Sequence, residues 1–295
     1  MSERVVVAVV QQRCNGTREE NLARSAEGIA EAARRGAGLV LLPELHALPY
    51  FCQVMDTQYF ALAEPISGPT VSQLGDLARK NNIYIVGSIF ERRGAGVYHN
   101  TAVVLGPEGH LLGMYRKMHI PDDPGFCEKF YFTPGDIGFA PIATPQLTLG
   151  VQVCWDQWYP EGARLMALAG AQVLLYPTAI GWVPEEPKEE QVRQREAWII
   201  MHRAHAVANA LPVLVANRVG WESNPQRPET GIQFWGTSCI LGAQGEVLAQ
   251  ADSESETVLT VEIDPTRTEA LRRIWPFLRD RRIDAYQGLL ERFLH

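Results

Sequence analysis

Three residues at the ends of short apolar segments could together carry out nucleophilic attack on a carbonyl carbon. Cys154 ends the apolar segment 147–154 and precedes a turn into a helix that we expect to begin near Pro160. Backbone N–H groups and the helix dipole at such a turn favour a thiolate and can hold an oxyanion. Glu44 and Lys117 each follow another predicted strand, and they offer the base and the positive charge that a cysteine nucleophile requires.

These side chains can meet only if the strands before them end at one edge of a sheet. Short apolar runs alternate with amphipathic segments, and Thr17 and Glu20 have the spacing of a capping box that starts a helix. The predicted strands are 5–10, 39–42, 83–90, 100–105, 110–115, 147–154 and 173–176. The predicted helices are 17–35, one that opens near Pro69, 160–169, 192–209 and 266–273. Prolines interrupt the charged stretch 182–191, which we therefore expect to be a loop.

The same order of elements occurs twice. Residues 36–43, GAGLVLLP, match residues 170–177, GAQVLLYP, at an offset of 134. Residues 101–106, TAVVLG, match residues 237–242, TSCILG, at an offset of 136. Two offsets that agree this closely indicate a duplicated β-α-β-α-hairpin unit. Because continuously apolar strands need cover on both faces, we predict an α/β fold in which the two units form a four-layer α-β-β-α sandwich.

The domain organisation follows from the absence of a linker between the two halves. We expect residues 1–264 to form one domain. Residues 265–295 contain Trp275, Phe277 and a basic cluster that begins at Arg279, more aromatic and basic groups than a frayed tail needs. This C-terminal arm is expected to pack on a neighbouring subunit of a homo-oligomer.

Composition restricts the classes of partner. The chain has 295 residues and a net charge of -7, with no basic run that could follow a phosphate backbone, so nucleic acid is not an expected partner. No segment approaches the roughly 18 consecutive apolar residues of a membrane span, and we expect a cytoplasmic protein. The five cysteines include no C-x-x-C pair, and His202 and His205 lack a partner motif, so neither a disulfide framework nor a metal site is expected.

The residues around the three strand ends resemble the signatures of the nitrilase superfamily, the carbon-nitrogen hydrolases. The matching motifs are Pro43-Glu44, Tyr115-Arg116-Lys117 and Val153-Cys154-Trp155-Asp156. Members of that family have the α-β-β-α fold and a Glu-Lys-Cys triad. Longer segments resemble the branch that hydrolyses N-carbamoylputrescine, namely 117–122, 128–136, 154–161 and 176–181. The resemblance covers essentially the whole chain.

The resemblance implies a role for each matching residue. Cys154 matches the nucleophile, Glu44 the general base and Lys117 the group that stabilises the tetrahedral oxygen. Glu128 matches a second glutamate that helps to place the substrate. The resemblance further implies hydrolysis of a terminal ureide on a four-carbon diamine, without a cofactor or a metal.

The small-molecule cationic ureide that this branch hydrolyses ends in an ammonium group, which requires carboxylates and aromatic faces in its pocket. The candidates for this pocket are Tyr50, Asp122, Phe130, Trp155 and Glu185, with Asp123 and Trp158 also available. Two departures from the family pattern, Cys127 and the bulky Trp182, concern substrate preference rather than the chemistry.

Two alternatives stay open. The same chemistry could act on N-carbamoyl-β-alanine or an ω-amide, whose carboxylate would require a basic side chain. The segment 121–132 offers only Lys129 for that purpose, which disfavours this alternative. The other alternative is a catalytically inactive scaffold, which the intact Glu44, Lys117 and Cys154 disfavour because a scaffold needs none of them.

Overall fold

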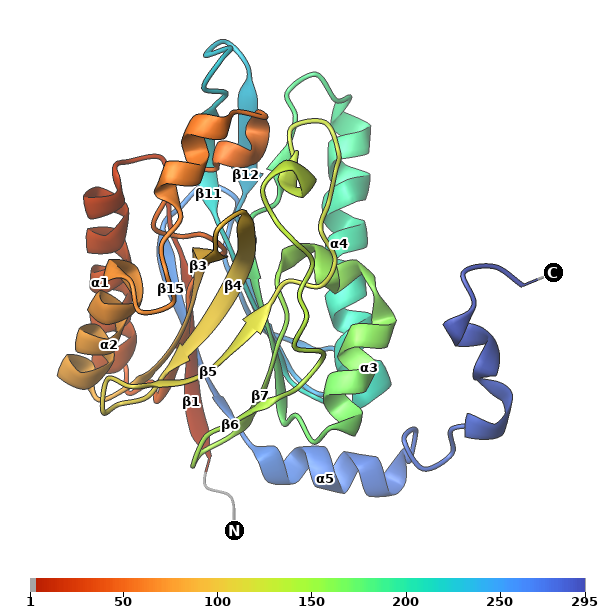
Figure 1. Cartoon of the computed structure of the whole chain (residues 1–295). Helices are drawn as coiled ribbons and strands as arrows, with labels where there is room; N and C mark the ends of the chain where they lie inside the picture. The colour runs from red at the N-terminus through yellow and green to blue at the C-terminus, as the bar shows by residue number, and fades with distance from the viewer. Residues whose placement is uncertain (1–3, 295) are drawn as a thin grey trace.

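Two six-stranded sheets pack face to face, with helices on their outer sides (Figure 1). The computed structural model describes residues 4–294. The first sheet has the order β15 (Thr257–Ile263), β1 (Val5–Gln11), β2 (Leu39–Leu41), β3 (Tyr84–Gly94), β4 (Val97–Leu105) and β5 (Leu111–Arg116). The second has the order β14 (Val247–Gln250), β13 (Cys239–Leu241), β10 (Val213–Asn217), β8 (Val173–Thr178), β7 (Thr148–Val151) and β6 (Ile142–Ala143). A small third sheet consists of β11 (Val219–Ser223), β12 (Gly231–Trp235) and β9 (Gly181–Trp182).

The helices complete the outer layers of the sandwich. The first sheet is covered by α1 (Arg18–Arg34) and α2 (Pro69–Asn81), and the second by α3 (Pro160–Leu168) and α4 (Lys188–Asn209) (Figure 1). The predicted capping box is present, since the Thr17 hydroxyl accepts from the Glu20 N–H and the Glu20 carboxylate accepts from the Thr17 N–H. The predicted four-layer sandwich is therefore confirmed.

Alternating side chains along one strand separate the two faces of the first sheet. Leu39 and Leu41 of β2 belong to the core between the sheets, together with Val173 and Leu175 of β8. Val40, between them in sequence, packs in the cluster that α1 and α2 cover. Because both faces of β2 are buried, its sequence is continuously apolar rather than alternating.

The duplication seen in the sequence is also present in the topology. In the first sheet β1, β2, β3, β4 and β5 are neighbours in that order, and in the second sheet β7, β8, β10, β13 and β14 are neighbours in the corresponding order. The last strand, β15, pairs antiparallel with β1.

Two boundaries differ from the sequence prediction. Helix α4 begins at Lys188, within the predicted loop, because Pro187 is its N-cap and Glu189 and Glu190 suit the positive end of the helix dipole. Strand β7 ends at Val151, and Cys154 is the first residue of a 3₁₀ turn, η4 (Cys154–Trp158), rather than the last residue of the strand.

The C-terminal part leaves the sandwich after α5 (Pro265–Ile274). Helix α5 is held against the body by hydrogen bonds from Arg272 to the Asn209 carbonyl at 3.0 and 3.3 Å. Beyond it the chain extends away from the sheets (Figure 1), and Leu290 is 91% exposed. A division into a domain 1–264 and an arm 265–295 stays a prediction.

Within residues 4–294 no helix has the length and apolar character that crossing a membrane demands.

Candidate active site

The predicted site residues meet at one end of the sandwich, where strands of both sheets finish. Glu44 follows β2, Lys117 follows β5 and Cys154 follows β7. Leu41 of β2, Tyr115 of β5 and Val151 of β7 lie in the core between the sheets, so the polar residue beyond each strand is held at the sheet edge. The two sheets thus bring Glu44 and Lys117 from one unit together with Cys154 from the other.

A buried chain of ionisable groups connects the two glutamates through the lysine. The Lys117 ammonium donates to Glu44 Oε1 at 2.7 Å and to Glu128 Oε2 at 2.6 Å, and all three side chains are buried. Tyr50 donates its hydroxyl to Glu128 Oε1 at 2.7 Å. The second oxygen of Glu44, Oε2, has no hydrogen-bond partner among the described residues, so it is free to accept a proton.

Cys154 has a backbone conformation that is uncommon for a residue with a side chain. Its φ is +43°, in the left-handed region, and its Sγ donates to the Ala179 carbonyl at 3.7 Å. The conformation is held by the Asp156 carboxylate, which accepts from the Val153 N–H at 2.9 Å and from the Tyr115 hydroxyl at 2.9 Å. Strain of this kind persists only where the surrounding structure fixes it, and it is concentrated at active sites.

Burial and the two carboxylates determine how the central groups titrate. Burial, followed by the charge of Glu44, raises the pKa of the Cys154 thiol well above its usual value, so the resting group is a thiol. The sequence had indicated a thiolate, but Lys117, which lowers the pKa of the thiol, does not offset these effects. Burial by itself lowers the pKa of Lys117, but Glu128 and Glu44 outweigh it and the pKa is raised well above its usual value. Burial raises the pKa of Glu128 to about 7, against the opposing effect of Lys117.

Two residues that the sequence did not single out position Glu44. Asn100 donates its amide to Glu44 Oε1 at 2.6 Å and accepts from Ser88. Arg218, wholly buried after β10, donates to the Glu44 carbonyl at 3.0 and 3.1 Å and to the Leu45 carbonyl at 2.7 Å. Arg218 follows a buried strand, as Glu44 does, and that position is the sequence signal that could have identified it.

His202 and His205 support the turn that carries the cysteine. His202 lies 3.1 Å from Gln157 Oε1, and His205 lies 2.7 Å from the Gln157 carbonyl oxygen. Trp198 also donates to Gln157 Oε1, at 2.9 Å. Across residues 4–294, no three or more His, Cys, Asp or Glu side chains are grouped so that they could hold a metal ion.

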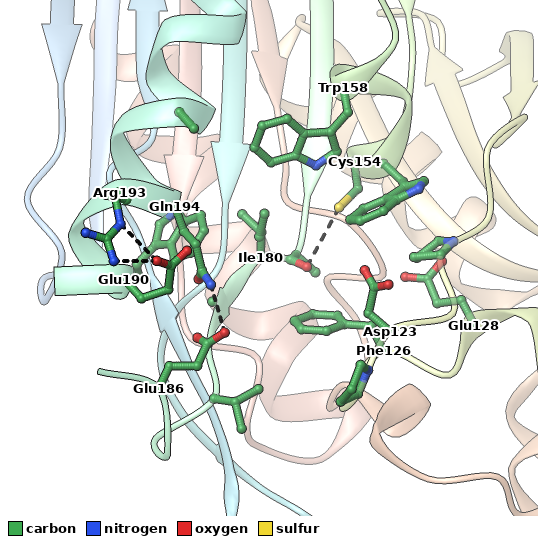
Figure 2. A pocket seen from close by; sticks show the side chains of 18 residues that line it. Asp123, Phe126, Glu128, Cys154, Trp158, Ile180, Glu186, Glu190, Arg193 and Gln194 are labelled. Carbon is green, nitrogen blue, oxygen red and sulfur yellow. Dashed lines mark hydrogen bonds and ion pairs between the residues drawn. The ribbon is translucent and has the colours of Figure 1, made fainter. Parts of the chain in front are cut away.

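A cavity of about 720 Å³ opens onto Cys154 (Figure 2). Its apolar walls include Phe126, Trp155, Trp158, Ile180 and Trp235. Its polar lining consists of Asp123, Glu128, Glu186, Glu190, Arg193 and Gln194. Figure 2 shows the last four of these on the opposite side of the cavity from Cys154. The cavity thus extends from Cys154 to a polar wall on the opposite side.

The predicted substrate-binding residues are only partly found in this lining. Trp155 lines the cavity, whereas Asp122, Phe130 and Glu185 are exposed residues outside its lining. Tyr50 is buried behind the cavity, where its hydroxyl binds Glu128. The lining instead uses Asp123 and Glu186, the next residues along the chain from Asp122 and Glu185. Nothing in the sequence of these irregular loops indicates which of two adjacent acids faces inward.

The fold and the site thus combine an α-β-β-α sandwich with a buried Glu-Lys-Cys cluster beside a cavity. Residues 6–273 match the carbon-nitrogen hydrolase family. The chain is 41% identical to N-carbamoylputrescine amidase of Oryza sativa subsp. japonica, covering 97% of this chain and 95% of that one. It is 40% identical to a citrullinase of Francisella tularensis subsp. tularensis, covering 98% and 99%. A carbon-nitrogen hydrolase of Helicobacter pylori G27 has a crystal structure with a TM-score of 0.96 and 47% identity, covering 99% and 100%.

This chain therefore belongs to the carbon-nitrogen hydrolase family, and it is a hydrolase that acts on amide-type C–N bonds. The resemblance found in the sequence and the predicted enzyme class are confirmed.

Proposed function

We propose that this protein hydrolyses the terminal ureide of N-carbamoylputrescine to putrescine, carbon dioxide and ammonia, a step of polyamine formation. The observation that supports this substrate is the charge of the cavity beside Cys154. Asp123, Glu186 and Glu190 line it against a single basic residue, Arg193, so it favours a molecule with a positive tail. The 41% identical relative is named for the same substrate.

The first half of the reaction forms a covalent carbamoyl-enzyme. Glu44 takes the proton of the Cys154 thiol as the sulfur attacks the carbamoyl carbon and its C=O π electrons move to oxygen. Lys117 and the Trp155 N–H stabilise the resulting oxyanion. When the C=O bond re-forms, the terminal C–N bond breaks and its nitrogen takes the proton from Glu44, so ammonia leaves.

The second half returns the free thiol. A water molecule gives a proton to Glu44 and attacks the carbamoyl carbon, and the S–C bond then breaks as Cys154 recovers the proton. The product is an N-alkylcarbamate, which loses carbon dioxide to give putrescine. Glu128, bonded to Lys117 at 2.6 Å, keeps the ammonium in position throughout both halves.

The tail-binding acids differ in the partners they already have. Glu190 is paired with Arg193, and Glu186 accepts a hydrogen bond from the neutral amide of Gln194 at 2.7 Å. Asp123 has no side-chain hydrogen bond or ion pair within the described residues, and in Figure 2 its carboxylate lies on the Cys154 side of the cavity. Glu186 and Asp123 therefore keep their charge available for the substrate ammonium.

Citrulline is the second candidate substrate. It contains the same ureide and the same terminal amine, with an added carboxylate on the carbon that bears the amine. Arg193 gives the cavity one group that could meet such a carboxylate, and the relative that is 40% identical is a citrullinase.

Ammonia release from a panel of ureides and amides tests the proposal. We expect N-carbamoylputrescine to have the highest kcat/KM, with N-carbamoyl-β-alanine at least about 100-fold lower because its carboxylate would face the acidic lining. The kcat/KM of an ω-amide is measured as a further comparison. A higher kcat/KM for citrulline or N-carbamoyl-β-alanine than for N-carbamoylputrescine would contradict the assignment.

Self-association and a cytoplasmic location are also part of the proposal. Apolar side chains on the outer faces of α3 and α4 are exposed, with Leu165 and Leu168 at 45% and Ile200 at 60%. Together with the arm, they support contact with a second copy of the chain. Sedimentation should show a species larger than 32.9 kDa at micromolar concentration, and a monomer alone would contradict self-association.

The proposed cytoplasmic location is supported by the five free cysteines, which suit a reducing compartment.

A further inference from the structure

We propose that Glu190 selects against ureides that carry an α-carboxylate, because it occupies the one basic side chain that could bind that group. This inference rests on the proposed function, since it concerns the same cavity. Among the described residues of the lining, Arg193 alone has a basic side chain.

The pair lies on the wall of the cavity that faces Cys154 (Figure 2). Arg193 Nε donates a hydrogen bond to Glu190 Oε2 at 2.9 Å, and Nη2 lies 2.7 Å from the same oxygen, so the guanidinium is paired with this carboxylate. Both residues belong to α4, one turn apart. The positive charge at this wall is therefore compensated within the helix.

Discrimination between the two candidate ureides must come from this wall. The reacting ureide is identical in N-carbamoylputrescine and citrulline, so the groups around Cys154 cannot distinguish them. Both molecules also carry an ammonium group, which Glu186 and Asp123 can meet in either case. Only the α-carboxylate differs, and it meets repulsion from these acids unless a free guanidinium binds it.

Glu186 and Glu190 consequently have different effects on substrate binding, although both line the same wall. The Glu186 carboxylate is bonded to the neutral side chain of Gln194 and keeps its full charge toward the cavity. The Glu190 carboxylate is bonded to a cation and cancels it. Loss of the Glu186 charge would weaken binding of both ureides, whereas loss of the Glu190 charge would release Arg193 for a carboxylate.

The expected effect is moderate because solvent screens the pair. The Arg193 side chain is 67% exposed and that of Glu190 is 43% exposed, and exposed ion pairs are weak. We expect Glu190→Gln to raise the ratio of kcat/KM for citrulline to kcat/KM for N-carbamoylputrescine by about three- to tenfold, where tenfold corresponds to about 1.4 kcal/mol.

The test measures this ratio in the full-length wild type, Glu190→Gln, Arg193→Gln and the double variant. Glu189→Gln is the matched control, because it removes the same charge from the first turn of α4 at an exposed position outside the lining. The ratio should rise in Glu190→Gln, stay unchanged in Glu189→Gln, and in the double variant fall back to its value in Arg193→Gln.

Three results would overturn the inference. They are an unchanged ratio in Glu190→Gln, an equal rise in Glu189→Gln, or a rise that persists when Arg193 is also replaced. Wild-type preference for citrulline would instead contradict the proposed substrate, while the change in ratio would still decide the role of Glu190. If neither ureide is turned over, the role of Glu190 is tested by binding instead. The dissociation constants of citrulline and N-carbamoylputrescine are then measured for Cys154→Ala with and without Glu190→Gln, and their ratio replaces the ratio of kcat/KM values.

Discussion

Replacing Lys117 by Met separates its electrostatic role from its size. Met fills a similar space but removes the ammonium that lies 2.7 Å from Glu44 and 2.6 Å from Glu128. Both carboxylates are buried and would face each other without a counter-charge. Removing one partner of a buried ion pair costs about 3–5 kcal/mol, and we expect a loss of that size in the free energy of unfolding at pH 8.

The same loss should depend on pH. Without the ammonium, the pKa of Glu128 rises above the value of about 7 that burial gives it in the wild type, because the charge that lowered it is gone. A carboxyl in the unfolded chain titrates near 4.5. As pH increases from there, the unfolded chain gives up its proton first, and stability falls by up to about 1.4 kcal/mol per pH unit. The wild type shares this fall up to about pH 7, where its own Glu128 becomes charged. The deficit of Lys117→Met relative to the wild type should therefore grow only above about pH 7, and be larger at pH 8 than at pH 5 by up to about 1.4 kcal/mol.

Urea unfolding followed by tryptophan fluorescence at the two pH values measures this deficit, and Glu128→Gln in the Lys117→Met background should recover part of it at pH 8. Turnover of N-carbamoylputrescine should fall by about 100- to 1000-fold in Lys117→Met, because one oxyanion donor is lost. A deficit below about 1 kcal/mol at pH 8, or one larger at pH 5 than at pH 8, would refute the electrostatic reasoning. Near-normal turnover would refute the oxyanion role.

Three further predictions concern the neighbouring groups. Cys154→Ala should abolish ammonia release while Cys239→Ala, at a buried thiol of the core, remains active; an active Cys154→Ala enzyme would exclude this nucleophile. The kcat/KM of the wild type should decrease below about pH 7, where Glu128 becomes protonated and no longer balances the Lys117 charge. Glu128→Gln should be slower and lack this pH dependence. A decrease at acidic pH that persists in Glu128→Gln would show that another group causes it. Arg218 holds the Glu44 carbonyl, and displacement of a reacting group by about 1 Å lowers the rate by about 100-fold. Arg218→Met should therefore lower kcat by about 100-fold. Unchanged turnover in a folded variant would contradict the positioning role.

The sequence by itself determined the architecture, because the signals that specify it are local or repeated. The capping box of Thr17 and Glu20 marks the start of α1 by contacts within the first turn of that helix. The two matching offsets predicted two equivalent units, and burial on both faces made their strands continuously apolar. The boundary of α4 was missed because prolines before Lys188 indicate a loop as readily as a helix start.

Candidate site residues at strand ends could be found for the same reason. Glu44, Lys117 and Cys154 come shortly after the ends of β2, β5 and β7, and parallel strands end at a common edge. Glu128 begins a short 3₁₀ turn without such a signal, and only the family resemblance indicated it. The charge state of Cys154 was beyond the sequence, since the pKa of the thiol depends on burial and on Glu44, which is distant in the chain.

Only the tertiary structure decided which side chains surround the substrate. In the loops before and after the sandwich strands, no periodicity sets the direction of a side chain, so Asp123 and Glu186 line the cavity while Asp122 and Glu185 do not. Glu190 lies on the same wall as Arg193 because α4 begins before the predicted point, so its first turn also lies along the cavity. Contacts between residues far apart in sequence form these walls, and their free energies depend on packing that no local pattern encodes.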